Sequence, residues 1–111
     1  MKDNIDREIL LSSGITYTSI YTYTCKKTGL HIVNGNINFN FVNGGGIRAY
    51  EISTNGSTNS IAAQVDCAPT YGTYIPVSFS VFMTKGDKIV FSARQNSGNP
   101  TNVQVYVSVC Y

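Results

Sequence analysis

Strict alternation of apolar and polar side chains constrains this chain more than any other feature of its sequence. The last tract, 103–110, shows it best, because every second residue is a valine and the residues between them are Gln, Tyr, Ser and Cys. Successive side chains of an extended strand point to opposite faces, so this spacing buries one face and exposes the other. No segment shows a convincing helical period of apolar residues. The sequence therefore predicts an all-β fold.

The same alternation, rich in β-branched and aromatic residues, extends over most of the chain. We expect strands at 16–25, 30–42, 47–54, 60–67, 75–83, 89–93 and 103–110, and a short first strand at 8–12. Turn residues separate these tracts at 13–14, 28–29, 43–46, 55–56, 69–72, 85–87 and 96–100. Seven or eight strands divided by such turns indicate a sandwich or a barrel. Gly35 interrupts the tract 30–42 and marks either a bulge or a bend.

Length and composition set the domain organisation. A chain of 111 residues is large enough for one core and too small for two. Its 42% hydrophobic and 13% charged residues are the reverse of a disordered composition. We expect residues 14–111 to form the domain and residues 1–13, where charged residues are frequent, to form a leader or attachment segment.

Charge, hydropathy and cysteine content narrow the classes of function. The net charge is only +2 and the basic residues are scattered, so we expect no nucleic-acid partner. No stretch approaches the roughly 18 apolar residues of a membrane span, and the N-terminus has no apolar signal segment. The three cysteines, Cys25, Cys67 and Cys110, leave two states open: one disulfide with a spare thiol, or three reduced thiols of a protein made in a reducing cytoplasm.

The residues that could carry chemistry are few and dispersed. His31 is the only histidine, and its approach to Cys25 on the preceding strand is weighed against an ordinary structural histidine. Glu51 and Asp66 are the only carboxylate pair that could be proposed for a glycosidase, and their spacing does not support one. The Gly44–Gly46 run lies between two strands, without the helix of a phosphate-binding loop. We expect no catalytic residue, no cofactor and no metal.

Three landmarks, taken in order, resemble a known family. They are residues 23–33 (YTCKKTGLHIV), residues 47–56 (IRAYEISTNG) and the turn at 83–89 (MTKGDKI), followed by a closing aromatic-ended strand. This order is similar to the globular-head jelly roll of the complement and tumour-necrosis-factor-like superfamily, a fold also found in bacteriophage fibre, baseplate and capsid-decoration proteins. The resemblance covers 16–111. It implies an antiparallel jelly-roll β-sandwich of about 8–10 strands that assembles as a homotrimer with one sheet facing the threefold axis.

Large aromatic residues at non-core positions predict where such a trimer would meet. We expect these residues on the face opposite the core, among serines: Tyr21, Tyr23, Phe82 and Tyr106. Leaving an apolar side chain in water costs about 25 cal/mol per Å², and aromatic residues are enriched at interfaces. The alternative is that they lie singly on the surface, which is common. We favour the interface.

These expectations combine into hypotheses about function. The leading one is a non-enzymatic virion structural or adhesion module, a trimeric fibre-tip, receptor-binding or capsid-decoration protein of a phage. Its partners would be its own copies, other virion proteins and host surface glycans. The second is a bacterial surface or secreted carbohydrate-binding module, and the third is a small sugar-modifying enzyme, which lacks a metal-binding histidine cluster. The loop residues proposed to contact glycans, against plain turn chemistry, are Asn55, Asn59, Tyr71, Tyr74, Asn96 and Asn99.

Overall fold

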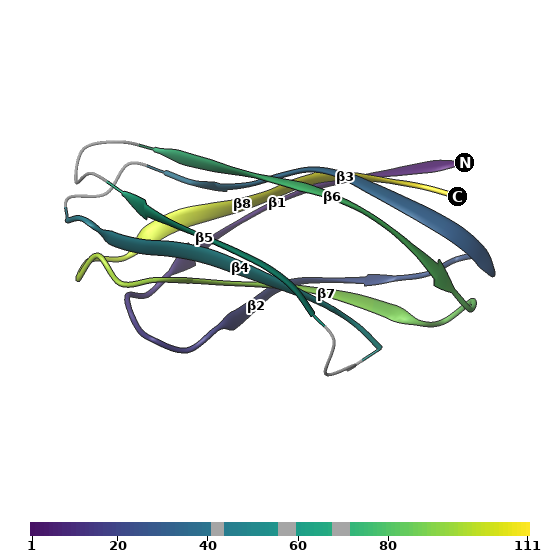
Figure 1. Ribbon diagram of the computed structural model, residues 1–111, viewed down its shortest axis with the longest axis horizontal. Helices are drawn as coiled ribbons and strands as arrows, with labels where there is room; N and C mark the ends of the chain where they lie inside the picture. Colours follow the sequence, from purple (N-terminus) through teal and green to yellow (C-terminus); the bar gives the residue numbers. More distant parts are fainter. Residues whose placement is uncertain (41–43, 56–59, 68–71) are drawn as a thin grey trace.

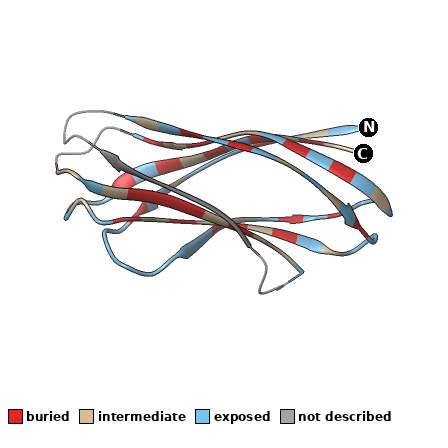
Figure 2. Ribbon diagram, viewed as in Figure 1, coloured by how far each residue is buried: buried red, intermediate tan, exposed pale blue. Residues whose placement is uncertain are grey.

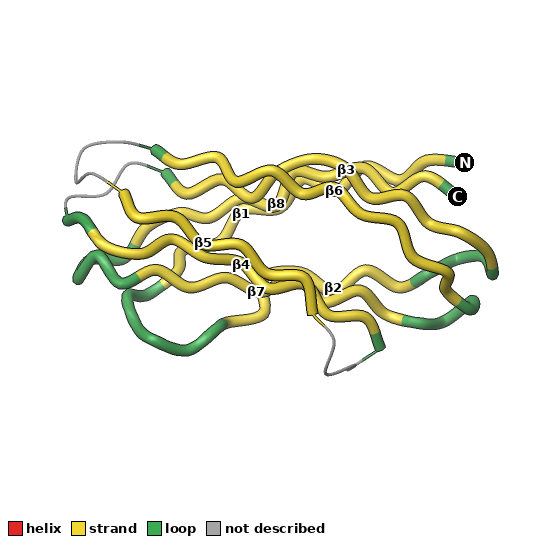
Figure 3. Tube along the Cα trace, in the orientation of Figure 1, coloured by secondary structure: helices red, strands yellow, loops and turns green. Residues whose placement is uncertain are grey.

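Eight strands make up the computed structural model, which describes residues 1–40, 44–55 and 72–111, and only the backbone of 60–67. The strands are β1 (Lys2–Leu11), β2 (Thr18–Thr24), β3 (Gly29–Phe39), β4 (Gly46–Thr54), β5 (Ser60–Cys67), β6 (Thr73–Met83), β7 (Lys88–Gln95) and β8 (Thr101–Cys110). Figure 3 shows only strands and connecting loops in these segments. The predicted all-β class is therefore confirmed.

The strands form two antiparallel sheets that pack face to face. Sheet A has the order β1-β8-β3-β6, and sheet B has the order β2-β7-β4-β5. The pairs β4–β5, β3–β6, β2–β7 and β1–β8 are nested inside one another along the chain, which is the wrapping of a jelly roll. Figure 1 shows the two layers and both termini at one end, where the amino group of Met1 donates to the carbonyl of Tyr111 at 2.9 Å.

Alternate side chains of both sheets fill the space between the layers, as Figure 2 shows by the buried positions along the strands. In β8 the four valines at 103, 105, 107 and 109 are buried, as the alternation predicts. Ile89, Phe91 and Ala93 of β7 meet them from sheet B and are completely buried. The core is thus the direct product of the period-two pattern.

The expected leader at 1–13 is wrong as a segment separate from the domain. Residues 2–11 form β1, which pairs with β8 without interruption from Lys2–Cys110 to Leu11–Thr101. Ile5 and Leu11 are buried in the core, and Ile9 packs against it. The charged residues that suggested a solvated tail alternate with these apolar side chains, several of them on the outer face. An attachment role for this segment stays a prediction.

Gly35 lies inside one continuous strand and does not interrupt it. It pairs with Val77 on β6 and with Val107 on β8, and no residue of β3 is skipped in either register. Its φ is +155°, a conformation that favours glycine. Of the two sequence-based alternatives, the bulge is therefore wrong.

Candidate functional site: the outer face of sheet A

The four residues predicted as one trimer interface do not share a surface. Phe82 and Tyr106 lie on the outer face of sheet A, with 69% and 55% of their surface exposed. Tyr23 belongs to sheet B and is buried in the core, and Tyr21 is half-buried against it. The register of β2 shifts between Ser19 and Tyr21, so that this strand has a bulge. A bulge changes which side chains face inward, and the prediction for Tyr23 is therefore wrong.

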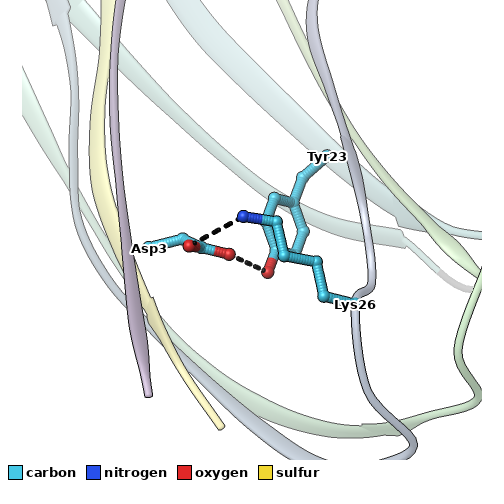
Figure 4. Close-up of polar contacts among 3 residues, drawn as sticks. All are labelled: Asp3, Tyr23 and Lys26. Atoms are coloured by element: carbon cyan, nitrogen blue, oxygen red, sulfur yellow. Dashed lines mark hydrogen bonds and ion pairs between the residues drawn. The ribbon is translucent and has the colours of Figure 1, made fainter.

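Tyr23 instead helps to close one edge of the sandwich. Its hydroxyl donates to a carboxylate oxygen of Asp3 on β1 at 2.7 Å, and Lys26 Nζ donates to the other oxygen at 3.0 Å. Figure 4 shows both side chains pointing at Asp3. The Tyr23 hydrogen bond is the largest cause that lowers the pKa of Asp3; burial opposes it, and Lys26 adds to it. Burial, followed by the Asp3 hydrogen bond, raises the pKa of Tyr23.

This cluster predicts a pH-dependent contribution to stability. Because the pKa of Asp3 is lower in the folded chain, its ionised form stabilises the fold above the unfolded pKa of about 4 and loses that effect as the pH falls below it. We expect Asp3→Asn to lower the free energy of unfolding by about 1 kcal/mol at pH 7. In urea unfolding repeated at about pH 2, the difference from the unmodified chain should vanish. An equal difference at both pH values would contradict this assignment.

One end of the outer face of sheet A is apolar. Leu30 of β3 lies directly opposite Phe82 of β6, and Ile32 is the next outward residue along β3. Their exposed fractions are 56%, 69% and 43% for Leu30, Phe82 and Ile32. We call these three residues the apolar patch. No polar side chain separates them, so they form continuous apolar surface of the kind that marks association sites.

A row of short polar side chains crosses the middle of the same face. Register places Asn4 of β1, Ser108 of β8, Asn34 of β3 and Ser78 of β6 side by side. Ser78 Oγ donates to Asn34 Oδ1 at 2.9 Å, and Ser108 Oγ donates to the Asn34 carbonyl at 3.4 Å. These side chains satisfy one another and separate the two ends of the face.

The other end is a shallow hollow of about 320 Å³ that mixes aromatic rings with amides. Tyr74 is 76% exposed and Tyr106 is 55% exposed. We call this hollow the tyrosine–amide site; its lining residues are Asn36, Asn38, Tyr74, Gln104 and Tyr106. A second hollow of about 530 Å³ adjoins it and shares Asn36 and Tyr106. The sequence had already placed the amides on the outward side of their strands, but only the strand order brings them next to Tyr74.

The predicted ligand loops do not converge. Asn59 and Tyr71 lie outside the described residues. Asn55 adopts a φ of 53° and bonds to Asp87 through its amide, whereas Asn96 Oδ1 accepts from the backbone of Ile47 at 2.6 Å. The carbonyl of Asn99 accepts from Gln95 at 2.7 Å. Asn55 and Asn96 adjoin opposite ends of β7, so these asparagines do not form one site, and their printed bonds are turn chemistry. Only Tyr74 belongs to a hollow.

The residues weighed for catalysis are held in structural roles. His31 is completely buried, its Nδ1 lies 3.0 Å from the Gly29 carbonyl, and its ring stacks on Tyr111 at 5.3 Å. Register places Glu51 and Asp66 four residues apart along β4, about 14 Å, which is wider than a glycosidase pair. Within the described segments no three His, Cys, Asp or Glu side chains gather as metal ligands would.

The remaining sequence candidates are resolved by the same contacts. The Gly44 and Gly45 carbonyls accept from the buried guanidinium of Arg48, so these carbonyls bind a cation, as a phosphate-binding loop would not. Cys25 and Cys110 carry free thiols, and burial raises the pKa of Cys25. The side chain of Cys67 lies outside the described part. Among the described residues no helix is long and apolar enough to cross a membrane.

Comparison with known proteins places this fold. No family model and no curated protein matches the chain. A chain of infectious bursal disease virus, Gx strain, aligns with 96% of the protein at 11% identity and a TM-score of 0.64; the protein spans 30% of that chain. The globular domain of zebrafish complement 1qA aligns over 96% of this chain and 95% of its own at 11% identity, with a TM-score of 0.51.

A third structure, TmCBM61 in complex with β-1,4-galactotriose, aligns over 93% of this chain and 68% of its own at 13% identity, with a TM-score of 0.52. At these identities the likenesses show the fold and not the function. The fold implied by the resemblance to the complement globular head is confirmed, and the chain has a jelly-roll fold shared by viral, complement and carbohydrate-binding proteins.

Proposed function

We propose that this protein is a non-enzymatic structural module that assembles with copies of itself through the apolar patch. The observation that carries the proposal is the continuous exposure of Leu30, Ile32 and Phe82 on two adjacent strands. A soluble chain gains about 25 cal/mol for each Å² of such surface that a partner covers. The enclosed positions of His31 and of the carboxylates support a role without catalysis.

The stoichiometry we propose is a homotrimer. Three copies related by a threefold axis can each bury the same patch, and closed rotational symmetry prevents open-ended growth. The shared fold with the complement globular domain supports this choice only by analogy. Of the residues first predicted at the interface, only Phe82 belongs to the apolar patch; Tyr106 lies beyond the polar row.

We further propose that the assembly is part of a virion, as a fibre-tip, receptor-binding or capsid-decoration protein of a phage, with other virion proteins as partners. The viral chain with a TM-score of 0.64 supports a virion context. The alternative is a bacterial surface or secreted carbohydrate-binding module. The tyrosine–amide site and the likeness to TmCBM61 favour this alternative.

Solution mass tests the assembly. We expect sedimentation equilibrium of the intact chain to give three times 12.1 kDa. Phe82→Asp places a charge within the contact, which costs about 3 kcal/mol and weakens association at least about a hundredfold. This variant should sediment at 12.1 kDa with an unchanged far-ultraviolet circular dichroism spectrum.

Tyr74→Asp is the matched control, because it places the same charge at the opposite end of the same face and should leave the mass unchanged. A monomeric unmodified chain at 100-fold dilutions upward to millimolar concentration, about the weakest useful affinity, would refute self-assembly. A Phe82→Asp variant that keeps the full mass would show that the apolar patch is not the contact.

A further inference from the structure

We propose that the tyrosine–amide site binds a neutral oligosaccharide, and that it does so independently of assembly through the apolar patch. This inference names a ligand class for a site that lies on the sheet face, away from the loops first considered. It rests on the orientation of the amides, on two oxygen atoms without partners, and on the placement of two exposed tyrosines.

A chain of hydrogen bonds sets the direction of the amides. Gln104 Nε2 donates to Asp6 Oδ1 at 2.7 Å, and Asn38 Nδ2 donates to Gln104 Oε1 at 3.0 Å. An ionised carboxylate only accepts, so Gln104 must turn its NH₂ group towards Asp6 and its oxygen towards Asn38. Asn38 must then donate its own NH₂ group. The orientation of both amides therefore follows from the charge of one aspartate.

This orientation leaves acceptors without donors. Asn38 Oδ1 and Asn36 Oδ1 are shielded from solvent and have no hydrogen-bond partner. A buried acceptor without a partner costs about 1–3 kcal/mol, which a ligand hydroxyl recovers by donating to it. The tyrosines that line the hollow are exposed, and exposed side chains change rotamer within nanoseconds, which opens access to the amides.

The chemistry of the lining selects the ligand. The five residues of the tyrosine–amide site are all uncharged, so an anionic or cationic ligand would find no counter-charge among them. Aromatic faces beside a few fixed hydrogen-bonding groups suit a sugar ring, whose C–H face is apolar and whose rim carries hydroxyls. Tyr74 and Tyr106 lie on the two strands flanking β3, about 10 Å apart across the sheet. This distance exceeds one sugar ring and therefore requires an oligosaccharide.

The site is remote from the proposed contact between copies. Leu30 and Asn38 are eight residues apart on β3, or about 27 Å, and the polar row lies between them. A trimer built on the apolar patch can therefore leave the tyrosine–amide site open, so loss of binding and loss of assembly can be measured separately.

Calorimetric titration of the intact protein tests the inference. The probes are cellohexaose, mannohexaose, chitohexaose and β-1,4-galactohexaose, with dextran sulfate as the anionic comparison. We expect at least one neutral probe to bind, Tyr74→Ala to weaken its binding about tenfold or more, and Tyr74→Phe to retain it, because stacking needs the ring and not the hydroxyl. Phe82→Ala is the control at the far end of the face and should bind like the unmodified chain.

The outcomes separate this inference from the proposed function. A monomeric Phe82→Asp variant that binds the oligosaccharide supports the site whatever the fate of the trimer. The inference is overturned if no neutral probe binds at millimolar concentration, if Tyr74→Ala with Tyr106→Ala binds as well as the unmodified chain, or if dextran sulfate binds better than every neutral probe.

Discussion

Gly35→Ala is expected to lower the free energy of unfolding by about 3 kcal/mol, because β3 and β8 touch at this position without room for a side chain. A Cβ atom on Gly35 would overlap the carbonyl oxygen of Tyr106 and lie 2.6 Å from Val107 Cα. Both obstacles are backbone, so no rotamer change relieves them. The φ of +155° adds strain for any residue with a Cβ.

Position in the sheet makes the effect large. β8 lies between β1 and β3, so it cannot move away from Gly35 without disturbing its pairing with β1. Urea unfolding followed by far-ultraviolet circular dichroism measures the change. Gly14→Ala is the control, since its Cβ would meet no atom within 4 Å, and it should alter stability by less than about 0.5 kcal/mol. Equal unfolding midpoints for the two variants would refute the close approach.

Arg48→Met is expected to destabilise the protein by about 3 kcal/mol, because a completely buried guanidinium satisfies the carbonyls before β4. Its NH2 group donates to the Gly44 carbonyl at 3.0 Å, and its NH1 group donates to the Gly45 carbonyl at 3.3 Å. Methionine keeps much of the volume but donates nothing. Replacing both partners of a buried polar contact can be neutral, but here the acceptors are backbone and remain.

The same unfolding experiment measures this change. Arg94→Met is the matched control, because Arg94 is half-buried and its guanidinium lies over the Tyr17 ring at 5.4 Å, an interaction of about 0.5–1 kcal/mol. The loss should thus be at least twice as large at 48 as at 94. If Arg48→Met unfolds at the same urea concentration as the unmodified chain, the bonds to the glycine loop contribute nothing to stability.

Fold class was predictable because the chain repeats one local rule. Every strand of sheet A keeps its apolar side chains on odd-numbered positions, such as Val105 in β8 and Ile37 in β3, and the inner face follows directly. β1 was misjudged because its charged residues alternate with only a few apolar ones. In β2 the bulge between Ser19 and Tyr21 altered the parity, and composition alone does not locate a bulge.

By itself the sequence determined which side of each strand faces the core, since that depends only on neighbours along the chain. Thus Asn36, Gln104 and Tyr106 could be placed outward from their positions alone. The tertiary structure decided which outward residues meet, because strand order and register join segments as distant as Tyr74 and Gln104, and local alternation holds no information about either. Division of one face into an apolar patch and a tyrosine–amide site is therefore a property of the folded sheet.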